Sequence, residues 1–202
     1  MKNKCTADKF LKDVEKHKLE TKIVLDNGLC RFLKFRKPET NNLYFNITTW
    51  PGYLCISGDM GTYVFARLPD MFDFFRSAEL KINPCYWHEK LQAEDRHMKS
   101  TEYDPERFER EIKEIFFAWV REGNKDKKTR RKIWEEIQYL VLSHRDTEFE
   151  AYHAVNEFEC LGFTFLDSSW GWRDYTYQFI WCLYAIVWGI QQYDKTPAEG
   201  VG

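Results

Sequence analysis

Between residues 22 and 67, short runs rich in β-branched and aromatic residues alternate with sequences that favour turns. Asp26-Asn27-Gly28 separates the first two runs, and Asn-Gly in that position is the strongest short-range signal for a β-hairpin. The later runs are separated by Pro51-Gly52 and by Gly58-Asp59-Met60-Gly61. Because such short links join only antiparallel neighbours, we predict an antiparallel meander of five strands, at residues 22–25, 29–35, 43–50, 53–57 and 62–67.

The segments on either side of this meander have helical patterns. Thr6 is a good N-cap for a short amphipathic helix over residues 6–18. Further helices are predicted to begin at Asn83-Pro84, at Asp104-Pro105 and at Thr147, and Gly162 is predicted to end the last of these. Another helix is predicted over residues 133–141, after a basic link at 124–132. Asp174 is predicted to cap an apolar helix at the end of the chain.

No internal repeat or low-complexity linker divides the chain, so we expect one α+β domain over residues 1–202. It should contain an N-terminal helix, the five-stranded antiparallel meander sheet in a sheet-rich segment over 19–67, and five helices packed on that sheet within 69–194. A C-terminal tail follows at 195–202.

Composition is typical of a soluble globular protein. Of the 202 residues, 44% are hydrophobic and 31% are charged, which excludes collagen-like, low-complexity and wholly disordered classes. The net charge of −2 gives no overall attraction for nucleic acid, although residues 1–37 carry 11 basic and 5 acidic side chains and residues 133–202 carry 3 and 11.

The first 15 residues are charged and contain no secretory signal, and the longest apolar run, at 179–190, falls well short of the ~20 residues of a membrane span. We expect a cytoplasmic protein that does not enter the membrane, with six reduced cysteines.

Several blocks of the sequence resemble a known family. They are TWPGYLCISGDMGTYVF at 49–65, MFDFFR at 71–76, YW at 86–87, EKLQA at 89–93, DYTY at 174–177, WC at 181–182 and WGI at 188–190. Over nearly its whole length the chain resembles an uncharacterised family of accessory proteins carried by tailed bacteriophages and prophages. The resemblance implies expression in a bacterial cytoplasm and a task in taking over host processes or in antagonising a defence system, such as CRISPR or nucleotide signalling. It implies no catalytic residue and no cofactor.

Few residues are candidates for chemistry. The sequence has no phosphate-binding loop, serine-nucleophile elbow or paired-cysteine motif. Asp59 has two interpretations, as part of a hairpin turn or as a rim residue of a ligand site. His88 and Glu89 are predicted to share a helix with Asp95 and His97, but the two histidines are nine residues apart and would point to opposite sides. We therefore predict no catalytic residue, no metal and no cofactor.

Aromatic residues make up 17% of the chain and provide the other candidates. Aromatic residues on predicted strands near basic residues are typical of platforms that stack nucleic-acid bases, and the alternative is that these rings are buried in the core. The five aromatic residues are Tyr44, Trp50, Tyr53, Tyr63 and Phe65, and the four basic residues are Arg31, Lys34, Arg36 and Arg67. The loop Trp170-Gly171-Trp172-Arg173 has the composition of a protein-binding hot spot, with a lid over the core as the alternative.

The leading interpretation is a phage-encoded cytoplasmic accessory protein, without enzymatic activity, that binds a host protein and inhibits a bacterial defence system. One alternative is a module that binds a nucleotide or single-stranded nucleic acid. The other is a nucleotide- or nucleic-acid-processing enzyme around Asp59, His88 and Glu89. No oligomeric state is indicated. The predicted partner- or ligand-binding residues are Trp50, Asp59, Arg67, Trp87, His88, Glu89, Trp170, Trp172 and Arg173.

Overall fold

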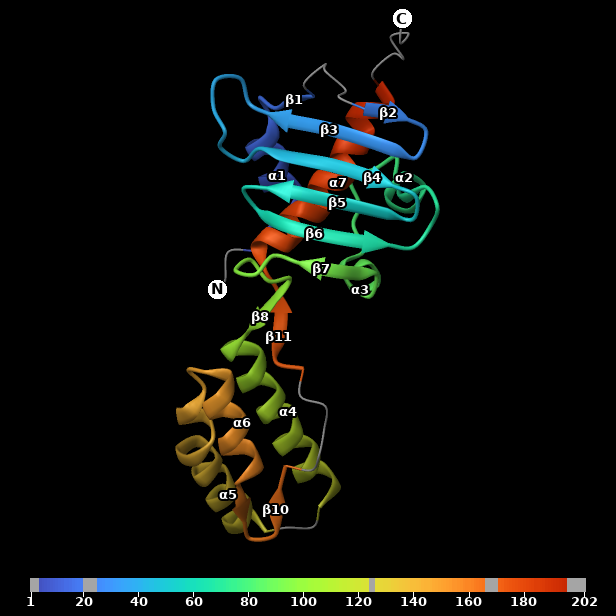
Figure 1. Ribbon diagram of the computed structural model, residues 1–202. Coiled ribbons are helices and arrows are strands. Elements are labelled where there is room, and N and C mark those ends of the chain that lie inside the picture. The colour runs from blue at the N-terminus through green and yellow to red at the C-terminus, as the bar shows by residue number, and fades with distance from the viewer. Residues whose placement is uncertain (1–3, 20–24, 124–125, 166–170, 196–202) are drawn as a thin grey trace, which may run out of the picture. The chain divides into compact units, whose positions relative to one another are not determined.

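The chain has an α+β fold, as predicted, in a computed structural model that describes residues 4–19, 25–123, 126–165 and 171–195 (Figure 1). Within the single domain expected from the sequence, the structure distinguishes two compact units. The sheet unit comprises Met1–Thr101 and Tyr175–Gly202, and the helical unit comprises Glu102–Asp174. Strands β8 (Thr101–Tyr103) and β11 (Arg173–Tyr175), where the chain passes between the units, form a two-stranded sheet.

A seven-stranded antiparallel sheet forms one layer of the sheet unit. Its order is β1 (Lys18–Leu19), β3 (Cys30–Arg36), β4 (Phe45–Trp50), β5 (Tyr53–Gly58), β6 (Gly61–Ala66) and β7 (Leu91–Glu94), with β2 (Leu25–Asn27) also pairing with β3. The meander β3 to β6 agrees with the prediction, whereas β1 and β7 are additional strands. Most of the predicted strand at 22–25 lies outside the described residues, and its last residue begins β2.

Strand β7 lies where the sequence predicts a continued helix. Helix α3 (Pro84–His88) begins as expected, with the Asn83 side chain accepting a hydrogen bond from the backbone N–H of Tyr86, but it ends after one turn. Leu91–Glu94 then pair with β6. These residues are good helix formers, but pairing at the sheet edge satisfies their backbone groups, and this tertiary contact overrides local propensity.

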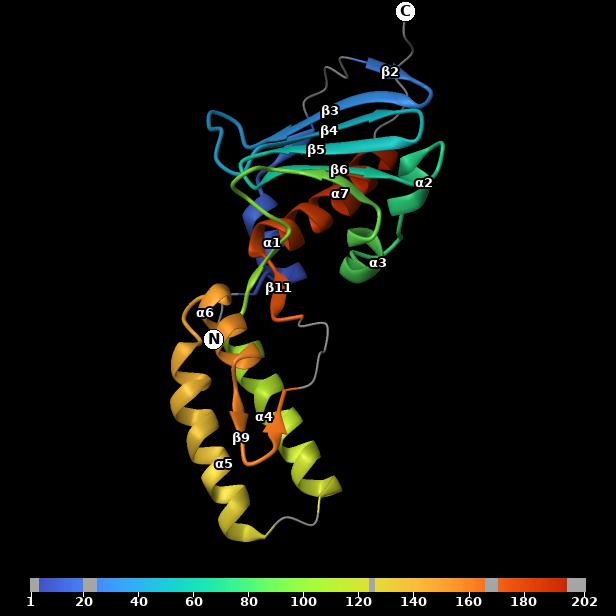
Figure 2. The same cartoon turned by 60° about the horizontal axis from the view of Figure 1, so that its bottom comes forward.

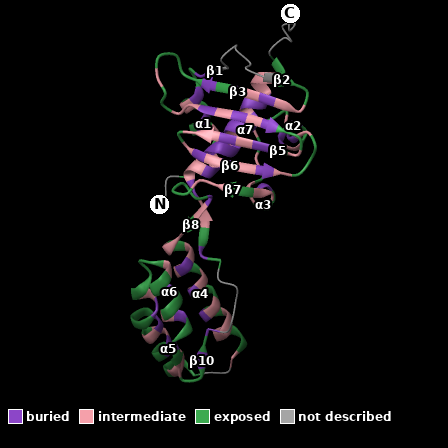
Figure 3. Cartoon of the chain, in the orientation of Figure 1, coloured by how far each residue is buried: buried purple, intermediate pink, exposed green. Residues whose placement is uncertain are grey.

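Helices α1 (Ala7–Val14), α2 (Met71–Phe75), α3 and α7 (Tyr177–Lys195) all cover the same face of the sheet (Figure 2). The strands alternate accordingly, with buried residues toward the helices and more exposed ones on the other face, as in β3 and β4. Figure 3 shows the buried residues concentrated along α7 and the strands in front of it. We refer to the face that none of these helices covers as the outer face.

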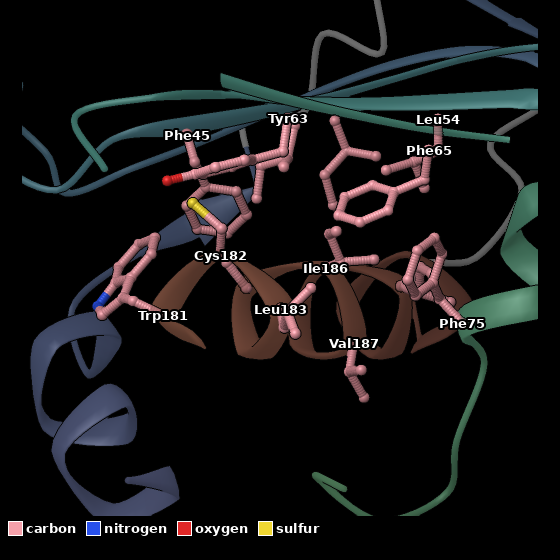
Figure 4. Close-up of a cluster of buried hydrophobic side chains, with 14 of the residues drawn as sticks. Phe45, Leu54, Tyr63, Phe65, Phe75, Trp181, Cys182, Leu183, Ile186 and Val187 are labelled. Carbon is pink, nitrogen blue, oxygen red and sulfur yellow. The ribbon is translucent and has the colours of Figure 1, made fainter. Parts of the chain in front are cut away.

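The core of the sheet unit joins strand residues to α7. Figure 4 shows Phe45, Tyr63 and Phe65 facing one side of α7, from which Trp181 and Ile186 project. Gly189 allows the close approach of this helix, because a Cβ there would lie 2.6 Å from Cδ1 of Ile47.

The helical unit has a core of its own. It contains helices α4 (Pro105–Glu122), α5 (Lys127–Leu140) and α6 (Glu148–Asn156), a 3-10 turn at Leu142–His144 and a hairpin of β9 (Glu159–Cys160) and β10 (Phe163–Thr164). The apolar side chains of this unit are buried in a separate cluster. The sequence prediction places all later helices on the sheet, whereas these three bury their apolar side chains in this second cluster. An apolar helix face indicates burial, but not the element against which it is buried.

Three predicted boundaries are also wrong for local reasons. Helix α5 begins at Lys127 instead of 133, because Asp126 accepts hydrogen bonds from the backbone N–H groups of Lys128 and Thr129. Helix α7 is capped by Thr176, whose Oγ1 accepts from the Phe179 N–H at 3.2 Å, while Asp174 lies in β11. Gly162 does not end α6 but lies in the two-residue turn between β9 and β10, where its φ is +77°.

Candidate functional site

Of the two interpretations of Asp59, the structure supports its role in a turn and not one at the rim of a ligand site. Its Oδ2 accepts a hydrogen bond from the Leu43 N–H at 2.6 Å, and its own N–H donates to the carbonyl oxygen of Tyr44 at 3.1 Å. The preceding Gly58 lies so close to this segment that a Cβ would be 2.2 Å from the Tyr44 oxygen. The turn therefore holds the segment between β3 and β4, residues 37–44, which we call the 37–44 loop.

His88 belongs to a hydrogen-bonded network that orders residues 94–100. Its Nε2 lies 3.1 Å from Oγ of Ser100, and that hydroxyl donates to Oε2 of Glu94 at 2.6 Å. Burial raises the pKa of Glu94, but hydrogen bonds from Ser100 and Lys99 outweigh it and lower the pKa below its usual value. The Glu94 carboxylate is therefore a hydrogen-bond acceptor, and the Ser100 hydroxyl donates its only proton to it.

This arrangement does not resemble that of a serine nucleophile, whose hydroxyl donates to the imidazole. Ser100 is only 3% exposed, and Glu89 is an exposed residue whose carboxylate pairs with Lys90 at 3.2 Å. Among the described residues, no group of three or more histidine, cysteine, aspartate or glutamate side chains is placed to hold a metal ion. The geometry at His88 and Glu89 thus gives no support to the enzyme alternative.

Two of the candidate residues lie exposed at the end of the β4–β5 hairpin. Trp50 stacks on Tyr53, with ring centroids 5.3 Å apart and an interplanar angle of 12°, and each side chain is 39% exposed. The two residues are cross-strand partners, so the contact stabilises the hairpin. Arg67 is exposed at the end of β6.

Two other candidate tryptophans are core residues. Trp87 is 7% exposed and packs edge-on against Phe75 at 4.8 Å. Trp172 is 2% exposed and packs edge-on against Phe108 at 4.7 Å, which agrees with the interpretation as a lid over the core. Arg173 is exposed and pairs with Glu148 at 2.5 Å, whereas Trp170 lies outside the described residues.

The proposed stacking platform is divided between the two faces of the sheet. Tyr63 and Phe65 are fully buried beneath the helices, as the core alternative predicts. Arg31 also points to the buried side, where it forms two hydrogen bonds with Asp70, at 2.9 and 2.8 Å, and lies 4.4 Å from the Phe72 ring. These residues belong to the core and not to a nucleic-acid surface.

Three of the remaining platform residues, Lys34, Arg36 and Tyr44, line a small pocket on the outer face, which we call the basic pocket. It has a volume of about 320 Å³ and is lined by Lys34, Phe35, Arg36, Asn41, Tyr44 and Asn46. Lys34 and Arg36 come from β3, Asn46 from β4, and the other polar residues from the 37–44 loop. The sequence indicated Lys34, Arg36 and Tyr44, whereas Asn41 enters through the fold of the loop and Asn46 through its pairing with Lys34 in the sheet.

A second concave site lies in the helical unit, and we call it the aromatic groove. Its volume is about 400 Å³, and it is lined by Phe116, Phe117 and Val120 of α4 with Lys127, Arg130, Arg131 and Trp134 of α5. The Trp134 ring lies 5.0 Å from that of Phe116 and 5.9 Å from that of Phe117. Phe117 is 53% exposed, so part of this aromatic surface faces solvent.

The rim of the aromatic groove is strongly basic. Residues 127–132 read KKTRRK, with no acidic residue in the first turn of α5. Arg131 pairs with Glu135 at 2.8 Å, but Nε of Arg130 is buried and finds no hydrogen-bond partner among the described residues. This site is not predicted from the sequence, because the basic composition of 124–132 favours a link, although Asp126, followed by Arg130 and Trp134 four residues apart, is a usable helix signal.

Comparisons with protein-family models, curated proteins and solved structures returned no match to this chain. The resemblance to phage accessory proteins therefore remains an expectation from the sequence. Among the described residues, no helix combines the length and the apolarity that crossing a membrane requires.

Proposed function

We propose that this protein is a binding protein without enzymatic activity, and that its aromatic groove receives an acidic, amphipathic segment of another protein. In the setting that the sequence resemblance implies, the partner is a bacterial host protein and binding inhibits a defence system. The observation that carries the proposal is the open aromatic surface of Phe117 and Trp134 beside the basic first turns of α5.

The apolar lining favours a protein segment. Aromatic side chains next to arginine are the usual anchors of protein interfaces, and a groove between two helices suits an apolar helix face with anchors one turn apart. A nucleic acid would instead require a polar track for successive phosphates, and the floor of this groove is formed by Phe116, Val120 and Trp134.

The charge of the rim specifies the partner's polar side. The N-terminus of a helix carries a partial positive charge, so basic residues in its first turns destabilise the helix. Lys127, Lys128 and Arg130 occupy such positions in α5. Asp126 offsets part of this cost by capping the helix, and a cluster of basic side chains kept at such a position is expected at functional sites. Aspartate or glutamate side chains of a partner would pair with these basic side chains.

The proposal is tested by placing a photo-crosslinking phenylalanine analogue at position 117 of the full chain, expressed in a bacterium. We expect one discrete covalent adduct, because this side chain projects from the groove into solvent. The matched control carries the same analogue at Tyr139, which is 74% exposed on α5 and does not line the groove. The adduct should also disappear in the Arg130→Glu variant.

A peptide-display selection supplies a defined probe. Peptides enriched on the wild-type protein and depleted on Phe117→Asp should combine aspartate or glutamate with large apolar residues. Enrichment of basic peptides, enrichment independent of Phe117, or adducts of equal yield at positions 117 and 139 would each contradict the proposal. A nucleic-acid adduct at position 117 would replace it with the nucleic-acid alternative.

A further inference from the structure

The basic pocket lies in the other unit and involves none of the groove residues, so it requires a separate explanation. We propose that this pocket binds a mononucleotide, that is, a phosphorylated ligand with a planar heterocyclic base.

The register of β3 and β4 brings the pocket's polar side chains together. Lys34 and Asn46 are direct cross-strand partners, and their ladder extends through the Phe35–Phe45 pair. Arg36 follows Phe35 and Tyr44 precedes Phe45, and both line the pocket together with Lys34 and Asn46. Directly opposed residues have Cβ atoms ~4.5–5.5 Å apart, so Lys34 and Asn46 are close neighbours at this pocket.

Each polar residue that lines the basic pocket matches one part of a nucleotide. The Lys34 ammonium and the Arg36 guanidinium supply positive charge for a phosphate. The Tyr44 ring, which is half-buried at the pocket, offers a face on which a base can stack. The amides of Asn41 and Asn46 each provide donors and an acceptor for the polar edge of a base.

The 37–44 loop has a strained backbone that is fixed by hydrogen bonds at Leu43. Two of its non-glycine residues have positive φ, Glu39 at +65° and Leu43 at +59°. Leu43 is held at both of its backbone groups, since its N–H donates to Asp59 and its carbonyl oxygen accepts from Nε2 of His17 at 2.9 Å. Strain that the surrounding structure maintains is typical of ligand-binding segments, and a rigid wall lowers the entropic cost of binding.

The pocket has room for one nucleotide and not for a strand. Its volume of about 320 Å³ is at the lower end of the ~300–1,000 Å³ range of ligand pockets. The cross-strand row beyond Asn46 continues through Ser57 and Thr62, which offer neither a ring nor a charge. Stacking and phosphate contacts therefore do not extend across the sheet.

The test is a calorimetric titration of the full chain, at low salt, with the four nucleoside 5′-monophosphates, with inorganic phosphate and with the unphosphorylated nucleosides. We expect saturable binding of at least one monophosphate, at least tenfold tighter than phosphate or the matching nucleoside. Lys34→Ala should weaken it by about tenfold or more, because a charge-assisted hydrogen bond is lost. Tyr44→Leu should weaken it by at least about fivefold through lost stacking.

The matched control is Lys81→Ala, which removes the same charge from the same unit at a side chain that is 78% exposed and paired with Glu79. It should leave the affinity unchanged, and circular dichroism should show that all variants are folded. Failure of all four monophosphates to bind, binding of phosphate alone with equal affinity, or affinity unchanged in Lys34→Ala would overturn the proposal. Binding of a single-stranded oligonucleotide more than tenfold tighter than a mononucleotide would overturn it in favour of a strand-binding surface.

Discussion

The buried ion pair between Arg31 and Asp70 permits a quantitative prediction. The Arg31 side chain is 10% exposed and that of Asp70 is 20% exposed. Asp70 also accepts the N–H of Phe72 at 2.9 Å and so caps α2. Asp70→Ala leaves the guanidinium buried without its counter-charge, which costs about 3–5 kcal/mol of unfolding free energy. In a chain of this size, that corresponds to a fall in Tm of roughly 6–20 °C.

The assay is urea unfolding of the wild type, Asp70→Ala, Arg31→Met and the double variant, followed by tryptophan fluorescence and circular dichroism. The double variant should lose less stability than Asp70→Ala alone, because it contains no uncompensated buried charge. As a control, Glu135→Ala breaks the Arg131–Glu135 pair, whose side chains are 80% and 57% exposed, and should cost at most about 0.5 kcal/mol.

The Arg31–Asp70 pair also makes the stability of the fold depend on pH. The hydrogen bonds from Arg31 lower the pKa of Asp70 below 3.8, its value in the unfolded chain. The stabilisation is therefore fully present above that pH and is lost as the pH falls through the lower, folded-state pKa. A loss below about 1 kcal/mol in Asp70→Ala, or a double variant less stable than this single variant, would refute the argument that the pair is buried and coupled.

Three further predictions concern the segments that hold the two sites. Gly58→Ala should destabilise the sheet unit more than Gly28→Ala, measured by thermal unfolding, because the new methyl group meets the Tyr44 carbonyl oxygen at 2.2 Å whereas at Gly28 it meets nothing within 4 Å. Burial lowers the pKa of His17 below 6.5, and the charge of Lys37 lowers it further, whereas the hydrogen bond to Leu43 and the charge of Asp13 act in the opposite direction. The stability of the fold should therefore fall as the pH drops below 6.5. The slope between pH 7 and 5 should be smaller in His17→Gln, and an equal slope would exclude His17 as its source. Asp126→Ala should reduce the helix content of α5, measured by circular dichroism, while Asp126→Asn should retain it, because asparagine is also a good N-cap.

The meander was predictable because its signals are local. Alternating residues identify the strands, and Pro51-Gly52 and Gly58-Asp59-Met60-Gly61 can form only tight links. In contrast, Leu91–Glu94 carry a helical propensity, and only the free edge of β6 makes them a strand. The start of α5 at Lys127 differs from the prediction for another reason, because the composition of a basic run favours a link, whereas Asp126 directly before it caps a helix.

The candidate residues were less predictable than the fold. For Asp59, Trp172, Tyr63 and Phe65 the sequence permits two roles each, one in the structure and one in binding. The structure supports the structural role for all four: a turn for Asp59 and the core for the three rings. Whether a ring is exposed depends on which face of the sheet the helices cover, and no local pattern specifies that face.

From its amino acids alone, this chain is an antiparallel meander followed by helices, because turn chemistry and side-chain periodicity act over a few residues. Only the tertiary structure decided that the later helices form a second core, that Arg31 is buried in an ion pair, and that Asn41 and Asn46 meet Lys34 and Tyr44. Each of these outcomes depends on contacts between segments that are distant in the chain. The hydrophobic effect that stabilises such contacts is non-directional, so a local sequence pattern does not specify which segments meet.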